Sequence, residues 1–265
     1  MKASLPHVYT TRLQKAGAAI EDTRILLRHW TDTLPKEELT DRLVAENALG
    51  KTSRMRVKDV VTRIFIPRYV DGDPKEAWRY LKILELGGMD GSSMSALLLF
   101  HTARCERLLY DFVVEELFPR FMVGRDEISV DDTARFISDA LVKRDAENWT
   151  ETVKIKVARG MLAALRDFGI LQGKAKKKIR APYLSPEAFA FIAFLVHLHT
   201  KSGERIVNSE DWRLYLLTPE AVERKFLEAH RLGYLSYRQA GNLRRIEFPY
   251  RTVEDMAHAI IESKT

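Results

Sequence analysis

Hydrophobic side chains in the first 125 residues recur every three or four positions, as they do along a helix that packs on one face. This spacing predicts one helix from Thr11 to Trp30. It predicts another that begins at Ser53, a good N-cap residue, and ends at Pro67 and the turn that follows. Two or three further helices are predicted between residues 75 and 118. Hydrophobic and polar residues do not alternate with a period of two anywhere in this region, so we predict an N-terminal helical domain over residues 1–125.

The pattern changes after residue 125. Ser129 opens a capping-box-like helix start, and Thr150 opens a second helix that Gly169 is well placed to end. Two short strands around a lysine-rich turn follow in residues 170–181. Helix, helix, strand, basic turn and strand is the order of a winged helix-turn-helix unit, which we predict for residues 126–185.

The same order of elements recurs in the last third of the chain. Residues 168–171 match residues 232–235, 64 residues further on, and residues 178–185 match residues 245–252. We therefore predict a second winged-helix-like unit over residues 186–265, giving a mainly α fold with short β-hairpin wings. Chance similarity between two helix–hairpin junctions is the alternative. A structure without a hairpin in either place would contradict the repeat.

Composition supports packed cores and excludes several classes of protein. The 265 residues are 46% hydrophobic and 30% charged, so a disordered or collagen-like chain is excluded. The single cysteine, Cys105, excludes a disulfide framework and a multi-cysteine metal site. The N-terminal segment lacks the apolar core of a signal peptide. The longest apolar run, residues 188–196, is nine residues long, whereas a membrane helix needs roughly 20. We expect a soluble, intracellular, cytoplasmic protein with no membrane partner.

Positive charge is concentrated in one segment. Residues 150–185 hold nine Lys and Arg against two acids, a larger excess than the +6 of the whole chain. Such a segment favours a polyanion as partner, because flexible cations release counterions when they contact phosphates. The alternative is a solvated surface loop. The helix from Thr150 would be the recognition helix, with its N-terminal turns towards the major groove of double-stranded DNA. The residues expected to contact DNA here are Lys154, Lys156, Arg159, Lys174, Lys176, Lys177, Lys178 and Arg180.

Two weaker basic stretches lie elsewhere in the chain. The second hairpin carries Arg238, Arg244 and Arg245, for which phosphate contact and protein contact are equally open. The N-terminal region holds a run of cations, of which we select Lys51, Arg54 and Lys58 as candidate DNA contacts, although a solvated helix face is the default interpretation. The whole run is Lys51, Arg54, Arg56, Lys58, Arg63 and Arg68.

Residues 45–52 match a relaxed phosphate-loop pattern, but nucleotide binding is not expected there. Ala45 stands at the first position of the pattern, helix-forming residues follow it, and no buried strand precedes it.

No catalytic constellation is present in the sequence. The seven histidines form no HExxH pair, and no G-x-S-x-G motif occurs. His197 and His199 would diverge on a helix and could not share a metal ion, and Cys105 is more typical of a core residue than of a nucleophile. We therefore expect a non-enzymatic protein without a cofactor, a metal ion or catalytic residues.

Several short motifs resemble those of one protein family. They are Tyr9-Thr10-Thr11-Arg12, Lys15-Ala16-Gly17-Ala18, Glu46-Asn47-Ala48-Leu49-Gly50-Lys51, Ala158-Arg159-Gly160, Leu165-Arg166-Asp167-Phe168-Gly169, Pro186-Glu187-Ala188-Phe189, Asp211-Trp212-Arg213 and Arg245-Ile246-Glu247-Phe248. From about Tyr9 to Pro249 the chain resembles the BrxA family of the bacteriophage-exclusion (BREX) defence islands. The resemblance implies a non-enzymatic, mostly helical protein that binds double-stranded DNA beside a methyltransferase and ATPases of the same island. Family members have been labelled inner-membrane proteins, a label from which this sequence departs.

Two other classes of function stay open at the level of sequence. A protein–protein adaptor would use its basic hairpin on an acidic partner, and its co-purification would survive nuclease treatment. A transcriptional regulator of the island would bind its own promoter far more tightly than random duplex.

Overall fold

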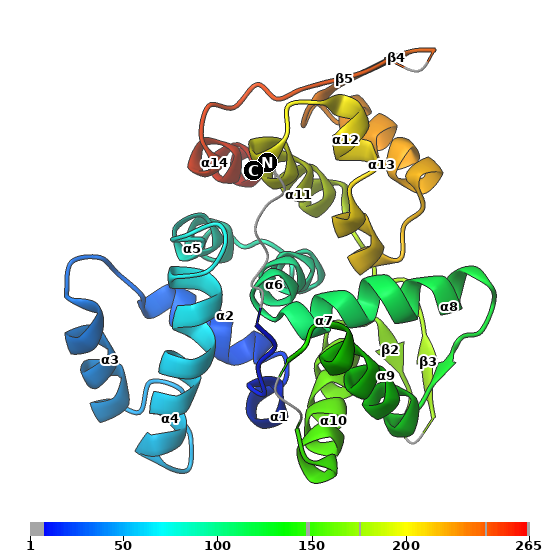
Figure 1. Cartoon of the computed structure of the whole chain (residues 1–265). Helices are drawn as coiled ribbons and strands as arrows, with labels where there is room; N and C mark the ends of the chain where they lie inside the picture. The colour runs from blue at the N-terminus through cyan, green and yellow to red at the C-terminus, as the bar shows by residue number, and fades with distance from the viewer. Residues whose placement is uncertain (1–7, 147–148, 175, 242, 264–265) are drawn as a thin grey trace.

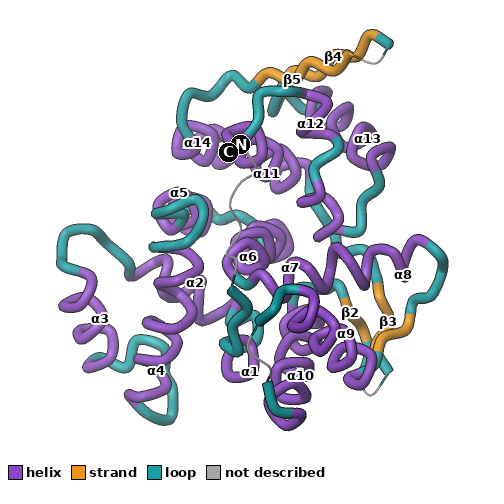
Figure 2. Tube along the Cα trace, in the orientation of Figure 1, coloured by secondary structure: helices purple, strands orange, loops and turns teal. Residues whose placement is uncertain are grey.

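The computed structural model describes residues 8–146, 149–174, 176–241 and 243–263, and it is mainly helical (Figures 1 and 2). The N-terminal part contains α1 (Leu13–Ala16), α2 (Ile20–His29), α3 (Lys36–Ala45), α4 (Arg54–Val60), the π-helical segment η1 (Val61–Val70), α5 (Trp78–Leu86), α6 (Gly91–Cys105), α7 (Arg107–Asp111), the π-helical segment η2 (Phe112–Leu117) and α8 (Phe118–Met122). The middle part contains β1 (Glu127–Ile128), α9 (Val130–Lys143), α10 (Glu151–Asp167), β2 (Leu171–Gln172) and β3 (Lys177–Ile179). The last part contains α11 (Pro186–His199), α12 (Gly203–Val207), the 3₁₀-helix η3 (Glu210–Tyr215), α13 (Pro219–Arg231), β4 (Ser236–Ala240), β5 (Leu243–Glu247) and α14 (Val253–Glu262).

Both predicted hairpins are present. In the middle part β3 pairs antiparallel with both β1 and β2, so the strand order is β1–β3–β2. In the last part β4 and β5 form a two-stranded antiparallel ribbon that extends along the top of the molecule in Figure 1. The prediction of a mainly α fold with short hairpins is confirmed.

The predicted helix from Thr11 to Trp30 is wrong in one respect, because it breaks into α1 and α2. Gly17 and Ala19 have φ angles of +54° and +52°, which a continuous right-handed helix cannot contain. The buried guanidinium of Arg68 donates hydrogen bonds to the carbonyl oxygens of Gly17 and Ala18, at 3.4 and 3.3 Å. This contact from a distant part of the chain holds the break.

Pro67 does not end its helix, contrary to the prediction, but the predicted turn that begins at Asp71 does. The chain continues from α4 through η1 to Val70, with Pro67 inside the π-helical segment. The wider π winding accommodates the ring, as the hydrogen bond from Asp71 N to Ile66 O across five residues illustrates (2.8 Å).

The hydrophobic core is continuous through the three parts. Helix α6 lies at the centre in Figure 1 and packs against η1, α7, α11 and η3. The apolar run at residues 188–196 belongs to α11, which is buried among α6, α13 and α14, so its hydrophobicity serves the core. None of the helices in the described ranges combines the length and the apolar character needed to cross a bilayer. The predicted domain boundaries at residues 125 and 185 fall in the turn before β1 and at the N-cap of α11, and the division into domains stays a prediction.

Candidate nucleic-acid interface

Helix α10 presents a basic face to solvent. The hydroxyl of Thr150 accepts a hydrogen bond from the backbone N–H of Val153 and so caps the helix start, and Gly169 terminates it with a φ angle of +80°. Between these ends, Val157, Met161 and Leu165 are buried, as their spacing predicts. Lys156 and Arg159 lie on the exposed side, and neither makes an ion pair within the described ranges. Both side chains are therefore available to an external anion.

Lys154 lies on the opposite side of α10. Its side chain is buried, its Nζ atom donates a hydrogen bond to Ser138 Oγ on α9 at 3.0 Å, and it forms an ion pair with Glu151. Because these contacts occupy the ammonium group inside the protein, the structure separates Lys154 from the exposed cations with which it was predicted to act.

The β2–β3 hairpin carries a second group of exposed cations. Leu171 and Ile179 face each other in the register and are buried against the core, so the lysine-rich turn projects outward. Gly173 starts this turn at a φ angle of +105°, and a Cβ atom there would lie 2.7 Å from the carbonyl oxygen of Lys176. The exposed side chains are those of Lys174, Lys176, Lys178 and Arg180.

The ion pairing of these hairpin cations is weak. Lys176 approaches Glu127 at 3.7 Å while its side chain stays 82% exposed, which is the geometry of a surface pair that contributes little. Lys177 is half-buried, and its Nζ donates a hydrogen bond to the carbonyl oxygen of Lys174 at 2.8 Å. Lys178 and Arg180 have no ion pair with any residue that the structure describes.

Helix α1 adds residues to this surface that were not predicted. A shallow hollow of about 350 Å³ is lined by Gln14 and Lys15 of α1 together with Lys156 and Arg159 of α10. The two helices approach so closely at Gly160 that a Cβ atom there would lie 2.2 Å from the carbonyl oxygen of Leu13. A glycine inside a helical pattern is the sequence signal for such an approach, although it does not identify the partner.

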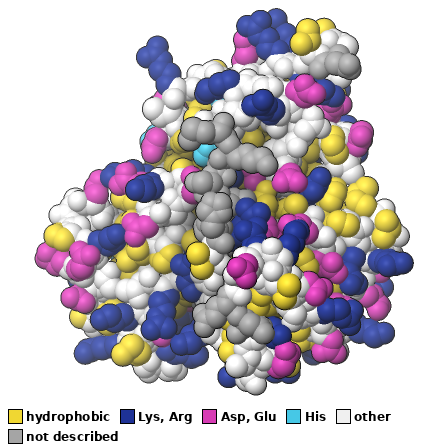
Figure 3. Space-filling view, in the orientation of Figure 1, with side chains coloured by type: hydrophobic (Ala, Val, Ile, Leu, Met, Phe, Trp, Pro, Cys, Tyr) yellow, Lys and Arg dark blue, Asp and Glu magenta, His cyan; other side chains and the backbone are white. Residues whose placement is uncertain are grey.

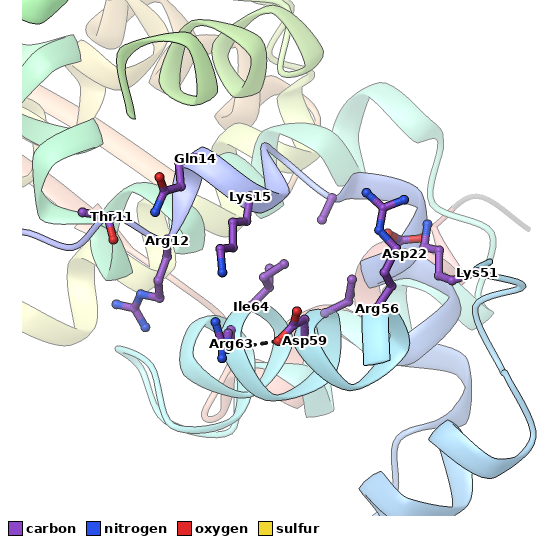
Figure 4. A pocket seen from close by; sticks show the side chains of 12 residues that line it. Thr11, Arg12, Gln14, Lys15, Asp22, Lys51, Arg56, Asp59, Arg63 and Ile64 are labelled. Atoms are coloured by element: carbon purple, nitrogen blue, oxygen red, sulfur yellow. Dashed lines mark ion pairs between the residues drawn. The ribbon is translucent and has the colours of Figure 1, made fainter. Parts of the chain in front are cut away.

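The N-terminal candidates lie on another part of the molecule. Arg54 and Lys58 are exposed on α4, whereas Lys51 forms an ion pair with Asp22 at 2.7 Å. Lys51 also lines a cavity between α1, α2 and α4–η1 (Figure 4). Arg68, the last cation of this run, is fully buried and bonded as described above.

The cations of the β4–β5 ribbon are engaged differently. Arg244 Nε donates to Glu223 Oε1 on α13 at 2.6 Å, and this hydrogen bond holds the pKa of the guanidinium above its ordinary value. Arg245 Nε donates to Glu247 Oε1 at 2.8 Å. Arg238 is exposed and has no ion pair within the described ranges. Figure 3 shows Lys and Arg side chains gathered over this ribbon and over α4.

Within the described ranges, His, Cys, Asp and Glu side chains form no cluster of three or more that could hold a metal ion. The side chains brought together at this surface are cations, which attract anions.

The fold and this surface define a mainly helical protein with two basic hairpins. The chain belongs to the BrxA family, whose model matches residues 7–195. Membership of this family suggests a role in BREX phage defence. A search among proteins of curated function found no match.

Proposed function

We propose that this protein is a non-enzymatic component of a phage-defence assembly that binds double-stranded DNA mainly through phosphate contacts. The observation that carries the proposal is the exposure, within one unit, of cations from α10 and from the hairpin that follows it. Among them, Lys156, Arg159 and Lys178 have no ion pair within the described ranges. Unpaired surface cations lose little when they exchange water and counterions for phosphate oxygens.

The order β1–α9–α10–β2–β3 supports a winged-helix arrangement. In such a unit α10 would enter the major groove by its N-terminal turns, where Thr152 and Lys156 are exposed. The hairpin with Lys174, Lys176 and Lys178 would lie along the neighbouring backbone. Lys154 is left out of this proposed surface because its ammonium group is occupied by Ser138 and Glu151.

Binding to a fluorescently labelled random duplex tests the proposal. At about 50 mM salt we expect saturable binding with a dissociation constant in the micromolar range or tighter, as multi-phosphate contact gives. A duplex whose anisotropy does not change at this salt concentration would overturn the proposal.

A second candidate function, protein–protein adaptor, rests on the β4–β5 ribbon. Arg244 and Arg245 are already paired within the protein, and Leu243 at the ribbon's tip is 78% exposed. Because these two cations are already paired within the protein, the ribbon has less charge to offer to phosphates, which favours a protein partner. The partner would be another protein of the same defence island, such as its methyltransferase or an ATPase. Co-purification that survives nuclease treatment and is lost in Leu243→Ser would support this role.

A further inference from the structure

A cavity of about 620 Å³ lies between α1, the start of α2 and the α4–η1 helix, away from the hairpin (Figure 4). Its volume is in the range of small-molecule sites, roughly 300–1,000 Å³. Charged side chains dominate its lining. The cations are Arg12, Lys15, Lys51, Arg56 and Arg63, and the acids are Asp22 and Asp59.

Both acids of the lining are already neutralised. Asp22 forms an ion pair with Lys51 at 2.7 Å, and Asp59 forms one with Arg63 at 3.1 Å. Lys15 and Arg56 are exposed, and their side chains make neither an ion pair nor a hydrogen bond with the residues that the structure describes. The cavity therefore has a net positive charge with two cations available to a ligand.

Two of these cations approach each other from different helices. Lys15 reaches down from α1 and Arg63 reaches up from η1, so that like charges point toward one another across the cavity (Figure 4). Asp59 compensates the charge of Arg63, whereas Lys15 has no ion pair within the described ranges, so a further anion between the two side chains would be stabilised chiefly by Lys15. Arg12, beside them, is fixed by Thr10 and by the buried carboxylate of Glu106, at 3.2 and 3.4 Å. A fixed guanidinium loses little conformational freedom when it binds an anion.

We propose that this cavity binds a chain of two or three phosphate groups. Several cations distributed around one cavity suit a polyvalent anion better than a single carboxylate. The described lining residues include no aromatic side chain on which a base could stack, so recognition would depend on the phosphates. Lys51 lines the cavity as part of an ion pair with Asp22, so the proposed site does not depend on the phosphate-loop-like pattern of residues 45–52. The phosphates could belong to a free polyphosphorylated ligand or to a DNA backbone, and the proposal does not depend on duplex binding.

Calorimetric titration of the full chain with sodium triphosphate, without divalent cations and at low salt, tests the proposal. We expect saturable binding of one triphosphate per chain, weakened about tenfold or more in Lys15→Gln/Arg56→Gln, because each charge-assisted contact is among the stronger hydrogen bonds. Both positions are exposed and without ion pairs, so the fold should persist. The charge-conserving pair Lys15→Arg/Arg56→Lys should restore most of the affinity. The matched control is Lys178→Gln/Arg180→Gln on the β2–β3 hairpin, two exposed cations that do not line the cavity, and it should bind triphosphate as the wild type does.

Wild-type protein that gives no saturable heat would overturn the proposal, as would equal affinity in Lys15→Gln/Arg56→Gln. The source of the phosphates follows from competition with labelled duplex. Displacement of the duplex by triphosphate would place DNA backbone in the cavity, and binding without displacement would indicate a free ligand. Since triphosphate is titrated without DNA, failure of duplex binding and failure of this site are separate results.

Discussion

The unit that ends in the β2–β3 hairpin and the unit that ends in the β4–β5 ribbon have the same order of helix and hairpin, but they use their cations differently. In the first hairpin, Lys178 has no ion pair within the described ranges, and Lys176 has only a long one. In the ribbon, Arg244 and Arg245 are held by glutamates at 2.6 and 2.8 Å. Both hairpins are basic, and they differ most clearly in how their basic residues are paired.

The preceding helices explain much of this difference. At the 64-residue offset of the repeat, Lys156 and Arg159 of α10 correspond to Glu220 and Glu223 of α13. Glu223 is the residue that binds Arg244. The second unit thus places acids where the first places cations, and its helix neutralises its own hairpin. We expect the first unit to dominate any binding of phosphates.

The largest effect is expected at two glycines where segments of the chain pack closely. Gly160 lets α1 approach α10, and Gly203 lets β5 approach α12. In Gly160→Ala and Gly203→Ala, the new Cβ atom would lie 2.2 Å from the carbonyl oxygens of Leu13 and Arg244, respectively. Each variant should lower the free energy of unfolding by about 2–3 kcal/mol, the upper range for overpacking.

Urea denaturation measures this loss, with Gly91→Ala as the control. There the nearest atom is an ordinary 3.8 Å away. An equal free energy of unfolding in Gly160→Ala and in the control would mean that α1 does not pack closely against α10.

The next effect concerns the first hairpin. Lys174→Gln/Lys176→Gln/Lys178→Gln should weaken duplex binding by about thirtyfold, because three phosphate contacts would be lost. The matched variant in the ribbon, Arg238→Gln/Arg244→Gln/Arg245→Gln, should weaken it by no more than about threefold, since two of its cations are already paired. Anisotropy titrations at one salt concentration measure both. Equal losses of duplex affinity in the two variants would contradict the proposal that the first hairpin contacts phosphates more than the ribbon does.

A smaller effect is expected from the helix faces. Lys156→Gln/Arg159→Gln should reduce duplex affinity by about tenfold through the loss of two phosphate contacts. Arg224→Gln, an exposed cation on α13, serves as the control and should bind as the wild type does. A loss in the control as large as that in the α10 variant would argue that both helices meet DNA.

The smallest effect should be a gain. Glu223→Gln removes the carboxylate charge beside Arg244, so duplex affinity should rise by about two- to threefold, in keeping with the modest energy of one surface pair. A fall in affinity in a competition titration would contradict this interpretation of the ribbon.

Local signals were sufficient for many elements of the fold. The caps at Ser129 and Thr150 and the end of α10 at Gly169 depend on residues within a few positions of one another, and all three are confirmed. The break at Gly17 could not be predicted, because Arg68 holds it from a distant helix. The passage of the helix through Pro67 likewise depends on π winding, which leaves no clear sequence pattern.

The candidate surface was predictable only in part. The exposed positions of Lys156 and Lys178 agree with the charge pattern. The burial of Lys154 had a sequence signal, since it lies four and seven positions before Ala158 and Met161 on the buried face. No sequence signal indicated the approach of Lys15 to Arg63, because α1 and η1 meet only through tertiary packing.

The most direct test of the different roles of the two hairpins is the salt dependence of duplex binding, measured from about 50 to 300 mM salt. Each phosphate contact contributes a slope of about −0.9 to log Kobs against log salt concentration. We expect Lys174→Gln/Lys176→Gln/Lys178→Gln to flatten the wild-type slope by about two to three units, whereas Arg238→Gln/Arg244→Gln/Arg245→Gln should leave it nearly unchanged. An unchanged slope in the first variant, or a larger change in the second, would contradict this expectation.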